Sequence, residues 1–460
     1  MVKRHLGTSV GLRARLLLAV AGLLLCAPPA APAQENVPFA PNPSSVAKAP
    51  QHQSRKAKER PLPGRLPDKP SLPPAYSIPV GPLGFSAPGA LYLGARNSLA
   101  SLDFLDENRL LFTFRVPGLM HREPGDSAGS EERQIRAVVL TLPEGKVEAE
   151  ALWTVHDRER YLWMLKDGHF LLRDRDGLAQ GDATLVLKPL LQFPGPLVWL
   201  DLDPTGQYLV TNSREPAAGA AKPGAADRPD SASASLVVDG QKQDGETDLV
   251  VRILQRESGK VMLVSRTRAT VHLPINADGY VESLRGNGQQ WLLNLNFFSG
   301  GSRILGPVES ACSPAFDFIS QRELLVTGCA GGGGRKLVAM DTGGRRLWEV
   351  STSPMEVWPL LVRSPDGSRL AQETLAADHA VNAYSPIDWE DVKGQLVRVF
   401  DAADGKVALE TPASPALDAG GNVAISSSGR RVAVLNAGAI QVFDLPAPRL
   451  ADAVETQLGR

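Results

Sequence analysis

The chain has 460 residues, 43% of them hydrophobic, and its 49 basic and 50 acidic side chains give a net charge of −1 at pH 7. This balance leaves no basic face of the kind that nucleic-acid binding requires, so we expect no nucleic-acid partner. After residue 33 no apolar run approaches the roughly 20 residues of a membrane-spanning helix, so we expect no membrane span.

Residues 1–33 have the pattern of a secretory signal peptide. Basic residues precede the apolar run LLLAVAGLLLC, from Leu16 to Cys26, and Ala31-Pro32-Ala33 follows it. The run is too short to cross a bilayer, and the small residues after it fit a cleavage site. We therefore expect an exported protein, periplasmic or extracellular. A lipoprotein signal at Cys26 is the alternative, but leucines precede this cysteine where a small residue is typical.

Residues 34–76 are rich in proline, lysine and arginine and contain few large apolar side chains. This composition predicts a disordered, extended tether. An Ala-, Gly- and Pro-rich stretch at about 213–235 predicts a second disordered segment, inserted within the folded part of the chain. Residues 447–460 are interpreted as a C-terminal tail.

Between residues 77 and 446 one pattern recurs: a strand, a tight polar turn and a second strand. The clearest copies are SLDFLDENRLLFTF at Ser101, WLDLDPTGQYLVTN at Trp199, AFDFISQRELLVTG at Ala315, LLVRSPDGSRLAQE at Leu360 and NVAISSSGRRVAVL at Asn422. Weaker copies begin at Tyr161 and Tyr280, and third strands that close on glycine turns follow most copies. Seven copies predict an all-β fold, a seven-bladed β-propeller with four-stranded antiparallel blades.

The last copy ends after its third strand, AIQVFDL at Ala439–Leu445. A closed ring leaves no raw sheet edge, so the missing strand should come from the N-terminal side. We expect it within Pro79–Arg96.

The copies resemble the WD40, YVTN and quinoprotein-like repeats of secreted bacterial propellers. LVAMDTGGRRLWEV is similar to the tryptophan-docking repeat of quinoprotein-like propellers, with Asp341, Gly343 and Trp348 in the matching places. The resemblance implies the propeller architecture. Quinoprotein alcohol dehydrogenases also have vicinal cysteines, which this chain lacks, so we expect no quinone cofactor. No histidine pair has metal-site spacing, and we expect no metal.

No phosphate loop, zincin helix or dinucleotide fingerprint is present, so no catalytic residue is nominated. The longest insertions all lie between the second and third strands of their blades, and strands alternate in direction, so these loops emerge on one face. Elaboration of one face predicts a binding face. The nominated residues are His121, Arg122, His379, Tyr384, Asp388, Trp389, Glu390 and Asp391.

The leading hypothesis is thus an exported binding or scaffold propeller that recognises a protein, peptide or cell-envelope glycan through these loops. The alternative is an enzyme, a hydrolase or lyase, whose acids and histidine converge on the ring axis from several blades. A deep axial pocket with clustered carboxylates and a histidine would favour the enzyme, whereas a plugged channel would exclude it.

Cys312 and Cys329 are the only cysteines after residue 33. A two-residue turn at Ser320 and Gln321 would pair them directly across a hairpin, about 4.5 Å apart between Cα atoms. Export permits oxidation, so we predict a disulfide, with two buried free thiols as the alternative.

Overall fold

The computed structural model describes residues 60–61, 66–87, 98–118, 132–156, 159–216, 247–331, 333–381 and 388–448. All of them lie in one compact unit, residues 54–460. Two single-turn 3-10 helices, Gly81–Leu83 and Trp389–Asp391, interrupt a structure built of strands. The strands are β1 (Arg60–Pro61), β2 (Tyr76–Pro79), β3 (Ala100–Asp106), β4 (Arg109–Arg115), β5 (Arg133–Thr141), β6 (Lys146–Val155), β7 (Leu162–Met164), β8 (Phe170–Asp174), β9 (Gly177–Gly181), β10 (Lys188–Gln192), β11 (Leu197–Leu202), β12 (Tyr208–Pro216), β13 (Thr247–Gln255), β14 (Val261–Thr267), β15 (Gly279–Arg285), β16 (Gln290–Phe297), β17 (Ser302–Glu309), β18 (Ala315–Phe318), β19 (Glu323–Cys329), β20 (Arg335–Asp341), β21 (Arg346–Ser351), β22 (Glu356–Arg363), β23 (Arg369–Ala377), β24 (Val392–Asp401), β25 (Val407–Ala413), β26 (Val423–Ile425), β27 (Arg431–Asn436) and β28 (Ala439–Asp444).

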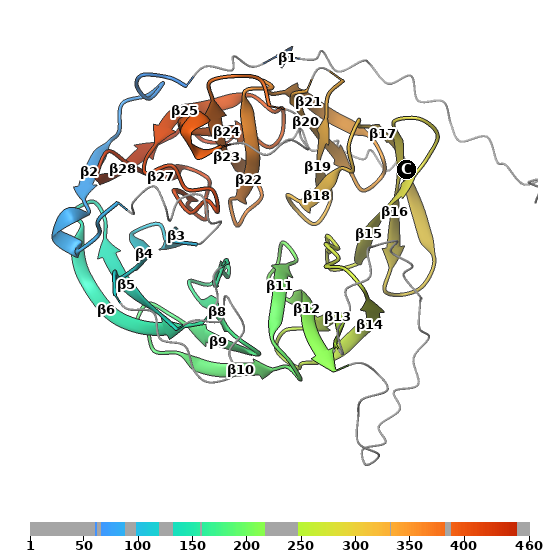
Figure 1. The fold of residues 1–460 in the computed structure, drawn as a ribbon, viewed down its shortest axis with the longest axis horizontal. Coiled ribbons are helices and arrows are strands. Elements are labelled where there is room, and N and C mark those ends of the chain that lie inside the picture. Colours follow the sequence, from blue (N-terminus) through green and yellow to red (C-terminus); the bar gives the residue numbers. More distant parts are fainter. Residues whose placement is uncertain are drawn as a thin grey trace, which may run out of the picture. The chain divides into compact units, whose positions relative to one another are not determined.

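Within the described residues the strands form seven sheets of antiparallel strands that follow one another in the chain, apart from β1 and β2, which each join a later blade. Figure 1 shows the sheets around a common centre, with β3, β11, β18 and β22 nearest the centre and β6, β10, β17, β21 and β25 toward the outside. The fold is the predicted seven-bladed β-propeller.

Two blades depart from the predicted four strands. In the part of the chain that the structure describes, the sheet β15-β16-β17 has three strands, and the sheet β18-β19-β20-β21 gains a fifth, because β1 pairs in parallel with β21. The outer strand of the three-stranded sheet contains Pro307, which has no N–H to donate, beside Gly306 at φ +128° and a register shift. Such a strand offers no continuous row of hydrogen-bonding groups to a further strand.

The core lies between neighbouring blades. Several second strands are buried along most of their length, as in β4, where only the terminal Arg109 and Arg115 are partly exposed. Trp348 on β21 crosses to the next blade, where its indole Nε1–H donates to the Ala402 carbonyl at 2.6 Å and its ring stacks on Phe400. This is the docking that the tryptophan repeat implies.

An N-terminal strand closes the ring. β2 pairs with β28 in the last blade, with Ile78 opposite Ile440, and Ile78 is buried in the core between the last and first blades. The prediction of an N-terminal closing strand is therefore confirmed. The strand lies earlier in the chain than predicted, at Tyr76–Pro79 rather than within Pro79–Arg96. The alternation of Tyr76, Ile78 and Val80 supplies the inward face, whereas residues 88–97 of the predicted range lie outside the described residues.

The end of the predicted tether contacts the ring. Ser71 exchanges two hydrogen bonds with the Glu410 backbone on β25, and Leu72 packs against an interblade core cluster. The folded part therefore begins before residue 77, because Leu72, an apolar side chain among the prolines, packs against the core. The signal segment 1–33, most of the tether, residues 217–246 of the insert and the tail from residue 449 lie outside the described residues.

No helix among the described residues is long and apolar enough to cross a membrane.

The structure joins Cys312 and Cys329 by a disulfide, with Cα atoms 5.4 Å apart. The predicted register is wrong by one residue: Ala315 pairs with Thr327 and Phe318 with Leu324, so the turn has one residue more than expected. Cys312 precedes β18 and is not held to strand geometry, so the two sulfurs meet in spite of the shift. Gln321 explains the longer turn, because its side chain accepts a hydrogen bond from Ala277 N–H and donates one to Asp203 in another blade.

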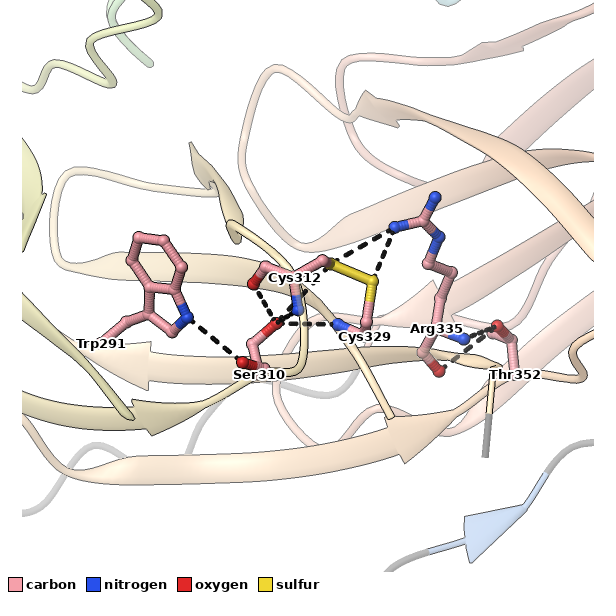
Figure 2. The surroundings of a disulfide bond; sticks show 6 residues. All are labelled: Trp291, Ser310, Cys312, Cys329, Arg335 and Thr352. Carbon is pink, nitrogen blue, oxygen red and sulfur yellow. Dashed lines mark hydrogen bonds between the residues drawn. A yellow bond between two sulfur atoms is a disulfide. The ribbon is translucent and has the colours of Figure 1, made fainter. Parts of the chain in front are cut away.

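Polar groups fix both ends of the disulfide (Figure 2). Ser310 Oγ donates to the Cys312 carbonyl at 2.6 Å and accepts from the N–H groups of Cys312 and Cys329. Arg335 Nη1 lies 3.1 Å from Cys329 Sγ and 3.7 Å from Cys312 Sγ. The bond thus ties the segment that enters β18 to the start of the loop between β19 and β20.

Alkylation in denaturant without reductant should modify neither Cys312 nor Cys329, because the disulfide leaves no free thiol at either residue. Both are buried, and an oxidising compartment permits the bond. Intact mass reports the result, and prior reduction under denaturing conditions is the control that should add two alkyl groups. Two modified cysteines in the unreduced, unfolded protein would contradict the pairing.

Candidate functional site

The structure describes five of the eight nominated loop residues. Trp389 is half-buried against a small core cluster that includes Val357 and Leu375, so it serves to dock the loop. Asp388 and Glu390 point to solvent. His121, Arg122 and Tyr384 lie outside the described residues.

Three of the loop's polar side chains come together. Donor atoms of Asp378, His379 and Asp391 lie within 4.8 Å of one another. The Asp378 carboxylate already accepts hydrogen bonds from His379 Nδ1 at 2.7 Å and Lys393 Nζ at 2.9 Å, which hold its pKa below the usual range. The group is largely exposed, and its Asp378 carboxylate is already paired with the Lys393 ammonium. We assign no ligand to it.

A cavity of about 360 Å³ lies where the first strands of six blades meet. Its lining is drawn from β3, β7, β11, β18, β22 and β26, from the turns beside them, and from β19 and β23. Its charged lining residues are Asp103, Arg160, Lys166, Asp201, Asp203, Asp317, Arg363 and Glu373. The volume falls in the range of small-molecule sites.

Arg363 crosses one part of this axial cavity. Its Nη1 donates to the Phe318 carbonyl at 2.6 Å and its Nη2 to the Leu202 carbonyl at 2.9 Å, so one guanidinium joins the first strands of three blades. Its terminal nitrogens are therefore engaged by the protein. A cavity remains beside the arginine.

Three carboxylates surround the second arginine. Arg160 donates from Nε to the Leu162 carbonyl at 2.9 Å, and its guanidinium lies 5.2 Å from the centre of the Trp163 ring. The positive charge of Arg160 acts on Asp103, Asp201 and Asp317, which lie on β3, β11 and β18. Each carboxylate comes from a different blade, so the cluster exists only in the folded ring.

Most of these carboxylates lack a strong partner. Asp103 accepts from Ser101 Oγ, and Asp201 accepts from the N–H of its neighbour Leu202. Among the described residues, none donates a hydrogen bond to the Asp317 carboxylate. Burial and the nearby charge of Asp201 raise the pKa of Asp317 to about 7, although Arg363 and Arg160 oppose the rise.

Glu373 reaches the cavity from a second strand, β23. Only 1% of it is exposed. Its Oε2 accepts from Gly421 N–H at 3.2 Å, whereas its Oε1 has no hydrogen-bond partner among the described residues. Burial raises the pKa of Glu373 to about 7, against the backbone N–H groups of Gly421, Asn422 and Val423, which lower it. A buried acceptor without a donor costs free energy, unless a ligand or water supplies the donor.

Tight packing holds this edge of the cavity. Gly421, at φ +103°, has its missing Cβ position 2.1 Å from the Ala100 carbonyl oxygen, so no larger residue fits there. Gln395 on β24 donates to Glu373 and to the Leu417 carbonyl, and accepts from Leu417 N–H and Asn422 Nδ2. The Glu373 carboxylate therefore accepts hydrogen bonds from two blades, from Gly421 N–H and from the Gln395 side chain.

The alternative hypothesis expected a histidine on the ring axis. No described histidine lines the cavity. His272 interacts electrostatically with the cavity residue Asp201, but burial lowers the pKa of His272. Its ring lies edge-on to the Trp199 ring, with the ring centres 4.4 Å apart. The carboxylates of the alternative hypothesis are thus present without their histidine.

No family model matches the chain, and no curated protein matches it. Similar solved structures include the Pyrococcus horikoshii acylaminoacyl peptidase, with 10% identity, a TM-score of 0.40 and coverage of 74% of this chain and 49% of that one. The β-propeller domain of the trilobed protease from Pyrococcus furiosus has 10% identity, a TM-score of 0.39 and coverage of 79% and 99%. TolB from Acinetobacter baumannii has 11% identity, a TM-score of 0.33 and coverage of 71% and 73%. The chain spans about half the length of the peptidase, and similarity at this level says nothing about function.

Proposed function

We propose that this protein is an exported binding propeller that holds a small polar ligand in its axial cavity. The observation that carries the proposal is the axial cavity of about 360 Å³, which is lined by charged side chains from several blades. Asp317, Glu373 and Arg160 are among these side chains. Binding sites are typically concave, with a few polar groups that converge on the ligand.

Export follows from the signal-peptide pattern of residues 1–33, with periplasmic or extracellular residence. The loop face stays the alternative binding surface, for a protein, peptide or envelope glycan. In the described part of this face, Asp378 is hydrogen-bonded to His379 and paired with Lys393. These side chains therefore have fewer polar atoms left for a ligand than the charged groups on the axis.

A substitution that fills the axial cavity distinguishes the two candidate binding surfaces. Leu360 lines the cavity and is 36% exposed, so Leu360→Trp should fill the space without replacing a charged group. We expect a thermal-shift screen of amines, amino acids, sugars and organic acids to yield ligands that stabilise the wild type but not the blocked protein. Leu152→Trp, at an outer position that is 55% exposed, is the matched control and should keep ligand binding.

A result in which every ligand binds equally to the blocked and control proteins would overturn the axial site and favour the loop face. Leu360→Phe, a smaller block, covers the case in which Leu360→Trp fails to fold.

One observation favours catalysis as a second candidate. Asp317 and Glu373 have pKa values of about 7, and groups with such values serve as general acids and bases near neutral pH. A bound ligand that is recovered chemically changed after incubation, in the wild type but not in Asp317→Asn, would establish an enzyme. Unchanged recovery supports binding.

A further inference from the structure

An apolar face of the sheet β15-β16-β17 is open to solvent. Leu284 is 57% exposed, Leu292 37% and Ile304 67%. Leu284 pairs with Leu292, and Ile304 pairs with Asn294, two residues further along β16. Paired residues of antiparallel strands share a face, and so do alternate residues of one strand. The three aliphatic side chains, Leu284, Leu292 and Ile304, therefore lie on one surface, which we call the open patch.

The open patch faces the preceding blade, β11-β12-β13-β14. Tyr280, on the same face of β15 as Leu284, packs in a core cluster with Val251 and Ile253 of β13. Leu293, on the opposite face of the sheet, is buried in the core shared with the following blade. The preceding blade thus covers the start of β15 and leaves its end exposed, where Leu284 lies.

The end of β15 lies on the same face of the ring as the insert between β12 and β13. Gln321 accepts a hydrogen bond from Ala277 N–H, just before β15, and donates one to Asp203 in the turn before β12. β12 and β15 therefore start at the same level and run toward the opposite face of the ring. The insert leaves the ring at Pro216 and returns at Thr247, in the blade beside the open patch (Figure 1).

The insert carries an apolar run that can reach the patch. Residues 217–246 contain one run of large apolar side chains, Leu236-Val237-Val238, among alanine, glycine, proline, serine and charged residues. Val238 comes nine residues before Thr247, where β13 begins. Nine extended residues span up to about 30 Å, which exceeds the roughly 10 Å between packed sheets.

We propose that residues 235–239 of the insert dock on the open patch, with the run Leu236-Val237-Val238 against its aliphatic side chains. Monomeric soluble proteins rarely leave such side chains grouped in the open, and the run is the apolar segment tethered beside them. The charges agree, because Asp239 directly follows the run and the exposed Arg285 directly follows Leu284. This surface is separate from the axial cavity, so the inference does not depend on the proposed function.

Other occupants fit less well. A second copy of the chain would bring two sets of the exposed Arg268 and Arg285 to one interface, where like charges repel. The N-terminal segment already follows the outer edges of the last three blades, with β1 on β21, Ser71 on β25 and β2 on β28. The ten residues before β1, PQHQSRKAKE, contain no large apolar side chain to place on the patch.

Hydrogen exchange of the full mature chain, read by mass spectrometry, tests the inference. In the wild type the amides of residues 236–239 should exchange at least roughly tenfold more slowly than in a free peptide of residues 231–242. Ile304→Asp should remove this protection, because burying its carboxylate under the run costs free energy. Leu284→Asp is the second patch variant, for the case in which Ile304→Asp fails to fold. Leu152→Asp, at an outer position of another blade that is 55% exposed, is the matched control and should keep the protection.

A pair of variants within the insert tests the same contact from its other side. Val237→Asp should bring the neighbouring amides close to the free-peptide rate, because it places a charge in the apolar run. Ala221→Asp makes the same charge change outside the run and should leave the amides of residues 236–239 protected.

Exchange of residues 236–239 at the free-peptide rate in the wild type would overturn the inference, as would protection that survives both patch variants. Sedimentation velocity tests the competing occupant. A wild-type dimer that Ile304→Asp dissociates, with residues 236–239 unprotected, would assign the patch to a second copy and overturn the inference. Ile304 lies outside the axial cavity, so each of these results leaves the proposed function standing.

Discussion

Replacing Glu373 with glutamine should stabilise the unliganded protein in alkaline solution and leave its stability nearly unchanged in acid. Glu373 is 1% exposed, and burial raises its pKa from 4.5 to about 7. Between these values the folded protein holds a proton that the unfolded chain has lost. The stability contributed by the neutral acid is therefore complete below about pH 4.5 and is lost as pH rises through 7. Glutamine stays neutral throughout, so the variant avoids this loss.

The expected difference follows from the pKa change. About 2.5 pKa units correspond to roughly 3 kcal/mol of unfolding free energy between acid and alkaline conditions. Denaturant unfolding of wild type and Glu373→Gln at about pH 5 and about pH 9 measures it. Glu390→Gln, an exposed position in the loop, should show no such pH trend. If the gap between wild type and Glu373→Gln were the same at both pH values, Glu373 would not titrate as the structure indicates.

The repeats made the fold predictable. Strand, turn and strand recurred with enough regularity to fix the blade count, and the unfinished last copy predicted an N-terminal closing strand. Register was harder to predict. The turn after β18 is one residue longer than the alignment suggested, because Gln321 is held by Ala277 and Asp203, which are distant in sequence. Local turn chemistry carries no signal for such a tertiary contact.

The axial site was only partly visible in the sequence. Asp103, Asp201 and Asp317 occupy the same position in three of the aligned copies, SLDFLD, WLDLD and AFDFIS. Equivalent positions of innermost strands lie at similar heights on the ring axis, so this recurrence was a usable signal for a carboxylate cluster. Motifs confined to one segment do not reveal it, because each of these blades contributes a single carboxylate.

Arg160 and Glu373 had no comparable signal. Arg160 lies just before a first strand, and Glu373 lies on a second strand of another blade, where it passes beneath Gly421 to reach the cavity. Their positions depend on how neighbouring blades pack, which periodicity does not specify. The loop residues around Trp389 are dense in polar and aromatic types, a pattern that predicts a binding loop but that a docked loop produces equally well.

Removing the closing strand should cost more stability than a single core substitution within it. β2 supplies the fourth strand of the last blade, and Ile78 packs in the core between that blade and the first. A chain that begins at residue 80 loses this burial and the packing of Leu72, and it leaves β28 with an open edge. We expect a loss on the order of 5 kcal/mol and a tendency to aggregate.

A chain that begins at residue 66 is the matched truncation and should unfold near the wild-type midpoint, since among the described residues it loses only β1, two residues at an outer edge. Within the full chain, Ile78→Ala should cost about 2–5 kcal/mol, while Ser77→Ala, its exposed neighbour in β2, should cost little. Denaturant unfolding compares all four proteins. If the chain that begins at residue 80 were as stable as the one that begins at residue 66, the ring would not depend on β2 for closure. The interblade contacts of Glu107 with Ser428 and Arg431 would then have to hold the first and last blades together.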